Sequence, residues 1–117
     1  MKTIGFLSMF FFILLTSCEK EDGFKFGETE TDFIVDSVYK TNCEGLLYVE
    51  LDASWNNFSL SVYADEISEP GIEIAYIRWH GSITQPLKKN TYWKISYNEA
   101  NPEEYVRRLV IRWTPIE

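Results

Sequence analysis

Hydrophobic and polar residues alternate along most of the chain beyond residue 30, which is typical of strands that bury one face. In segment 57–65, one face carries Phe58, Leu60, Val62 and Ala64, and the other carries Ser59, Ser61, Tyr63 and Asp65. Similar alternation occupies 32–40, 46–51, 91–97 and 105–114. Residues 72–79 are apolar on both faces, which predicts a strand at the centre of a sheet.

Turn-forming residues separate these segments. Residues 55–57 (Trp-Asn-Asn) predict a hairpin turn, and Pro70-Gly71 predicts a β-turn. Residues 81–90 predict a longer loop, and 98–104 a polar loop with room for one helical turn. About six or seven short strands at this spacing are typical of a sandwich. We therefore expect an all-β domain over 28–117, an antiparallel β-sandwich of immunoglobulin-like proportions.

The N-terminal residues have the pattern of a targeting signal rather than of a folded segment. Residues 4–15 form an apolar run that is too short to span a bilayer but has the length of a secretory signal core. The run ends in Leu15-Thr16-Ser17-Cys18, which resembles the lipobox of bacterial lipoproteins. The resemblance implies a signal peptide over 1–17, cleavage before Cys18, and acylation of that cysteine, which would anchor the chain to a membrane.

Residues 18–27 are charged and predict a tether, in which Phe24 and Phe26 are available for a short first strand. The acidic run 19–22 resembles the surface-export signal of some Gram-negative outer-membrane lipoproteins. That resemblance implies a lipid-anchored protein of the outer membrane, with surface display favoured over a periplasm-facing anchor.

A second resemblance lies near the C-terminus, in residues 93–98 and 107–111. These segments look like the closing hairpin of BACON-type modules, which are small immunoglobulin-like sandwiches in bacterial surface proteins. In that family a strand ending in Asn precedes a strand led by Arg, as Asn98 and Arg107 do here. The resemblance implies an immunoglobulin-like sandwich, which is also the fold class that the alternation of hydrophobic and polar residues predicts.

The formal net charge of −7 argues against a nucleic-acid partner, because phosphate contacts need a basic face. The charge is uneven: residues 18–69 hold 13 acidic and 3 basic side chains, and residues 70–117 hold 5 and 7. We expect acidic strands to lie beside basic ones, so that this asymmetry is neutralised within the domain.

No arrangement of residues predicts catalysis, a metal or a cofactor. His80 is the single histidine, and Ser82 is its nearest nucleophile, without a nucleophile-elbow motif. Acidic residues are numerous, but nothing selects a catalytic pair among Asp52, Asp65, Glu66, Glu69 and Glu73. We expect the acidic turn 65–69 to be solvated. A small hydrolase is the remote alternative.

The two cysteines have separate predicted roles. Once Cys18 is lipidated, Cys43 is the one remaining thiol, and we expect it to be a small buried residue. A reactive or intermolecular cysteine is the other interpretation.

Aromatic residues are the main candidates for binding. Trp93 and Trp113 are in phase with core positions, whereas Trp55 sits in a polar turn and Tyr63 on a polar face. The candidate ligand residues are Trp55, Tyr63, Tyr92, Arg108 and Arg112. An exposed aromatic ring beside hydroxyl and amide groups suits a glycan. The alternative is a protein-interaction lipoprotein, such as an accessory subunit, inhibitor or immunity factor.

Overall fold

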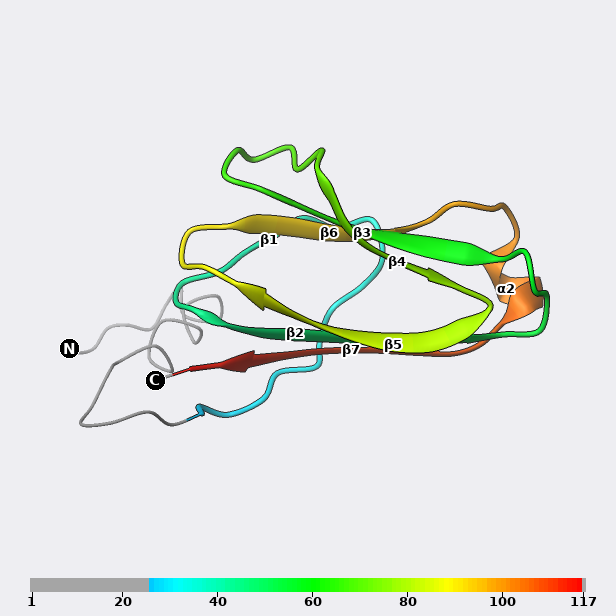
Figure 1. Cartoon of the computed structure of the whole chain (residues 1–117), viewed down its shortest axis with the longest axis horizontal. Coiled ribbons are helices and arrows are strands. Elements are labelled where there is room, and N and C mark those ends of the chain that lie inside the picture. Colours follow the sequence, from blue (N-terminus) through cyan, green and yellow to red (C-terminus); the bar gives the residue numbers. More distant parts are fainter. Residues whose placement is uncertain (1–25, 117) are drawn as a thin grey trace.

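The computed structural model describes residues 26–116 and confirms the all-β class. Two antiparallel sheets pack face to face (Figure 1): a four-stranded sheet in the order β1-β6-β3-β4 and a three-stranded sheet in the order β5-β2-β7. The elements are β1 (Tyr39–Lys40), β2 (Gly45–Ala53), β3 (Ser59–Asp65), β4 (Glu73–Arg78), β5 (His80–Leu87), β6 (Tyr92–Tyr97), α2 (Pro102–Tyr105) and β7 (Val106–Pro115). Within residues 26–116, no helix has the length and apolarity needed to cross a membrane.

The core lies where the alternation predicted it, between the two sheets. Alternate residues of β2 are buried, and the inward-facing residues of β3, β6 and β7 are buried against them. The buried set is Leu47, Val49, Leu51, Phe58, Leu60, Val62, Ile77, Trp93, Ile95, Ile111 and Trp113. Trp93 and Trp113 are therefore confirmed as core residues.

The predicted strand over 32–40 is mostly not a strand. Only Tyr39–Lys40 forms a strand beside β6, because Asp36 takes a left-handed conformation (φ 70°) that interrupts extended backbone. The Asp36 N–H still donates to the Ile95 carbonyl of β6 (2.7 Å). Phe33 and Tyr39 still pack on Trp93, with ring centroids 5.1 and 4.9 Å away. The alternation thus located core residues without locating a strand.

Two predictions about residues 72–90 were wrong. β4 lies at the edge of its sheet rather than at the centre, and it leaves Tyr76 53% exposed. Residues 81–90 were expected in a loop, but most of them belong to β5, which pairs along its whole length with β2. Pro86 is compatible with this strand because β5 is an edge strand, where the missing N–H faces no partner.

The predicted hairpin at residues 55–57 was also wrong, because the turn connects different sheets. β2 belongs to the three-stranded sheet and β3 to the four-stranded one, so residues 54–58 cross between layers. The single helical turn expected near 98–104 is present as α2, at the same end of the sandwich (Figure 1).

The chain passes from β4 to β5 through one residue, Trp79. Its N–H donates to the Phe58 carbonyl (2.7 Å), and its carbonyl accepts from the Ala53 N–H (2.8 Å). Phe58 leads into β3 and Ala53 ends β2, so Trp79 joins the two sheets at the α2 end of the sandwich.

Residues 26–30 run along the free edge of β7. Phe26 bridges Ile116, and Glu30 bridges Trp113 through two backbone hydrogen bonds of 2.8 and 2.9 Å. Phe26 therefore pairs as the sequence suggested, while Phe24 lies outside the described residues.

Candidate functional site

The outer face of the three-stranded sheet is built from rows of residues that the strand register places side by side. One row is His80, Asp52 and Arg108, from β5, β2 and β7 in turn. The next rows are Ser82-Glu50-Val110 and Thr84-Tyr48-Arg112. Asp52 of β2 thus lies opposite Arg108 of β7, which is one instance of the expected neighbouring of acidic and basic strands.

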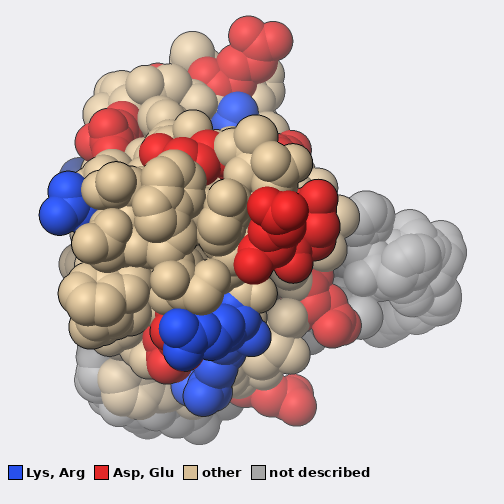
Figure 2. Space-filling view, turned by 90° about the vertical axis from the view of Figure 1, so that its right-hand side faces the viewer, with Lys and Arg blue, Asp and Glu red and all other residues tan. Residues whose placement is uncertain are grey.

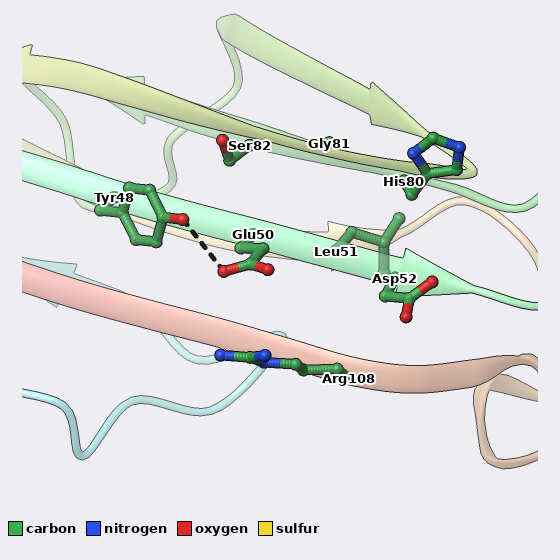
Figure 3. A pocket seen from close by; sticks show the side chains of 8 residues that line it. All are labelled: Tyr48, Glu50, Leu51, Asp52, His80, Gly81, Ser82 and Arg108. Carbon is green, nitrogen blue, oxygen red and sulfur yellow. Dashed lines mark hydrogen bonds between the residues drawn. The ribbon is translucent and has the colours of Figure 1, made fainter.

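A hollow of about 410 Å³ opens on this face (Figure 3). It is lined by Tyr48, Glu50, Leu51, Asp52, His80, Gly81, Ser82 and Arg108. The residues come from three strands that are distant in sequence, so the sheet register creates the hollow.

The side chains of the hollow present both donors and acceptors to solvent. The Tyr48 hydroxyl donates to Glu50 Oε1 (3.0 Å), which fixes this carboxylate beside the Tyr48 ring. The Arg112 guanidinium lies 5.4 Å from the centroid of that ring, within cation–π range. Figure 3 shows Arg108 running along β7 toward Glu50, and His80 beside Asp52 at one end of the hollow.

The hollow places the single histidine of the chain beside a serine and two carboxylates. His80 and Ser82 both line the hollow, yet no hydrogen bond joins His80 to Ser82 or to Asp52 in Figure 3. A nucleophile and its base need to be within hydrogen-bond reach of each other. The hollow therefore presents hydroxyl, carboxylate and guanidinium groups, which together can both donate and accept hydrogen bonds.

The predicted site residues fall on three separate surfaces. Arg108 lines the hollow, and Arg112 lies beside it. Trp55, 38% exposed, lies in the connection at the α2 end, where its ring stacks on Tyr105 at 5.0 Å. The other two residues, Tyr63 and Tyr92, are on the outer face of the four-stranded sheet.

Tyr63 and Tyr92 are brought close together. Tyr63 faces Lys94 and Asp65 faces Tyr92 in the register of β3 and β6, so the tyrosines are diagonal neighbours, about 7–8 Å apart. Lys94 lies over the Tyr63 ring at 5.8 Å and Lys40 over the Tyr92 ring at 5.4 Å. Each ring thus already has a cation as its partner.

The serines beside Tyr63 are not available to a ligand. Ser59 and Ser61 were expected on an exposed polar face, but both are 2% exposed. The carboxylate of Glu99 accepts from Ser59, that of Glu73 accepts from Ser61 (2.9 Å), and Asn98 donates to both hydroxyls (3.0 Å). These hydrogen bonds within the protein occupy both serine hydroxyls.

Sequence reasoning missed Trp79 as a site residue. It is 45% exposed, and its ring lies edge-on to His80 with a centroid distance of 4.3 Å. The apolar pattern of 72–79 suggested a buried central strand, so its last residue was not considered for binding. Its position directly before His80-Gly81, where the alternation ends, was the available signal.

Figure 2 shows the end of the sandwich that carries α2. An acidic patch and a basic patch lie close to each other on this end, and a broad area of uncharged side chains extends to their left.

Cys43 is 6% exposed, as expected of a small buried residue, but its sulfur is disulfide-bonded. The expected lone thiol applies to a lipidated chain, in which Cys18 would not be available for a disulfide. The chain's other cysteine, Cys18, lies outside the described residues. A thioether to lipid and a disulfide both occupy a cysteine sulfur, so lipidation of Cys18 and a disulfide between the two cysteines exclude each other.

Comparison with known proteins finds no matching family model, curated protein or solved structure.

Proposed function

We propose that the chain is an exported, lipid-anchored, non-catalytic binding module that holds a glycan on the outer face of its three-stranded sheet. The observation that carries the proposal is the hollow lined by Tyr48, Glu50, Asp52 and Arg108 beside His80 and Ser82. Carboxylates accept from sugar hydroxyls, guanidinium and hydroxyl groups donate to them, and an aromatic ring takes the apolar face of the sugar.

The proposed location rests on the N-terminal sequence. The apolar run and the lipobox-like tetrapeptide ending at Cys18 support lipidation, and residues 19–22 support display at the outer-membrane surface. The intact mass of the protein extracted from membranes tests this. A chain of residues 18–117 plus acyl groups supports anchoring, and an unacylated chain with a disulfide contradicts it.

A thermal-shift panel of soluble polysaccharides tests the glycan site. A ligand at 100 times its dissociation constant stabilises the native state by about 2.7 kcal/mol, which is several degrees in Tm. Glu50→Gln keeps the shape of the side chain but removes its charge, and should reduce the shift. Thr84→Ala, on the same outer face of β5 but outside the hollow, is the matched control.

The same panel shows which surface binds the glycan, the hollow on the three-stranded sheet or the outer face of the four-stranded sheet. A shift that Glu50→Gln abolishes and Tyr63→Ala preserves supports the hollow. The opposite pattern would move the site to the four-stranded sheet. No shift with any polysaccharide would remove the glycan proposal.

A protein partner is the second candidate, and the edge of the four-stranded sheet favours it. Ile67, Ile72 and Tyr76 are 61, 57 and 53% exposed on β4 and the loop before it. Exposed apolar side chains on an open sheet edge are a common basis of protein association. A photo-crosslinker at Tyr76 should then give one discrete product in whole cells, and a smear or no product would count against it.

A further inference from the structure

Trp79 has a backbone conformation that its side chain does not favour. Four non-glycine residues of the described chain have positive φ: Asp36, Asn90, Asn101 and Trp79. Asp and Asn visit the left-handed region readily because their short polar side chains bond locally, whereas a bulky residue there is an outlier. Trp79, at φ 71°, is the exception among the four.

Both sheets hold Trp79 in this conformation. Its N–H is bonded to Phe58 and its carbonyl to Ala53, so the backbone cannot relax without breaking a contact to one sheet. Strained positions that the surrounding structure holds in place are concentrated at functional sites. The fold requires a left-handed residue here, and glycine or asparagine would meet that requirement at lower cost.

The ring of Trp79 is not packed in the hydrophobic core. It is 45% exposed, in contrast to the 2% and 5% exposure of the core residues Trp93 and Trp113. It lies against His80, and His80 lines the hollow. An exposed indole therefore lies next to the polar side chains of the hollow, separated from them by one imidazole ring.

We propose that Trp79 is the aromatic platform of this site, and that the ligand is an oligosaccharide long enough to reach from Trp79 to Arg108. One sugar ring stacks its C–H face on the indole, because the negative face of the ring attracts polarised C–H groups. The next sugar lies in the hollow, where Asp52 and Glu50 accept from its hydroxyls and Arg108 donates to them. This inference rests on the proposed glycan-binding function and adds the class of ligand and the residue that selects it.

The test measures dissociation constants of the full chain in detergent for hexasaccharides of xylose, mannose and glucose, by isothermal titration. Trp79→Ala should weaken binding at least 10-fold, which is about 1.4 kcal/mol, because aromatic anchors carry a large share of the binding energy of a site. Trp79→Phe keeps an aromatic face and should stay within about threefold of the wild type. Tyr76→Ala, which removes an exposed aromatic ring at the edge of the four-stranded sheet, is the control and should leave affinity unchanged.

A stability readout shows whether the backbone conformation is as described. Trp79→Gly and Trp79→Ala both remove the ring, but only glycine fits a left-handed position without strain. Trp79→Gly should therefore have the higher Tm by several degrees, which reverses the usual order of alanine and glycine in extended backbone. A higher Tm for Trp79→Ala would contradict the strained conformation.

The outcomes separate this inference from the proposed function. If the wild type binds none of the hexasaccharides, both fail. If Glu50→Gln weakens binding while Trp79→Ala stays within twofold of the wild type, the glycan site stands and Trp79 is not part of it.

Discussion

Gly45 lies at the start of β2, directly under the ring of Trp113. A Cβ atom added at Gly45 would lie 2.5 Å from Trp113 Cζ2, 2.6 Å from Cη2 and 2.7 Å from the Thr114 carbonyl oxygen. These separations are well inside van der Waals contact, so Gly45→Ala forces either the ring or the β7 backbone to move. Trp113 is 5% exposed and cannot swing into solvent.

We expect Gly45→Ala to lower the free energy of unfolding by about 1–3 kcal/mol, the usual cost of overpacking a core. For a domain of this size, each kcal/mol corresponds to about 4–8 °C in Tm. Thermal unfolding followed by circular dichroism measures the change. Gly71→Ala is the matched control, because a Cβ at Gly71 meets no atom within 4 Å, and it should change stability by less than about 0.5 kcal/mol.

A double-mutant cycle identifies the clash. Phenylalanine lacks the Cζ2 and Cη2 atoms of the indole, so Gly45→Ala should cost at least about 0.5 kcal/mol less in a Trp113→Phe background. Equal costs in both backgrounds would assign the strain to the Thr114 carbonyl instead. If Gly45→Ala is as mild as Gly71→Ala, the Trp113 ring does not lie over Gly45 and the packing of β2 on β7 is wrong.

Three further predictions concern other parts of the chain. Burial raises the pKa of Glu30 above its ordinary value of 4.5, and the charges of Glu28 and Asp32 raise it further. The contribution of Glu30 to stability is therefore full below pH 4.5 and is lost as pH rises through the folded-state pKa. Glu30→Gln should therefore have a Tm above the wild type at about pH 7 and none of this advantage at about pH 3.5, and an equal gain at both would contradict the raised pKa. Trp55→Ala removes the stack on Tyr105 and should cost about 0.5–1.5 kcal/mol beyond the area it exposes, and urea denaturation showing no loss would contradict that contact. Cys18→Ser should move the chain from the membrane fraction to the soluble fraction, and continued membrane retention would contradict lipid anchoring.

Much of the fold follows from period-two alternation. It located the core of β2, β3, β6 and β7 because a half-buried strand repeats every two residues, whatever its neighbours are. It misplaced β4 because apolar residues on both faces fit a central strand and an exposed edge equally well. It missed β5 because the outer residues of that strand are polar and Pro86 indicated a loop, although proline is tolerated on an edge strand.

The site was less predictable than the fold. Arg108 and Arg112 were identified from their shared face, but their partners Asp52 and Tyr48 depend on the register of β2 with β7, which one sequence does not specify. Trp79 depends on a left-handed φ at the crossing between sheets, and a tryptophan gives no local signal for that conformation.

The most direct test of the proposed function is to map the ligand onto the structure. Amide chemical shifts of a ¹⁵N-labelled chain beginning at Glu19 would be followed during titration with the hexasaccharide that binds best. The account predicts that the largest changes fall on the β2, β5 and β7 residues that line the hollow, and on Trp79. Changes confined to β3 and β6 around Tyr63 and Tyr92, or no saturable changes, would contradict it.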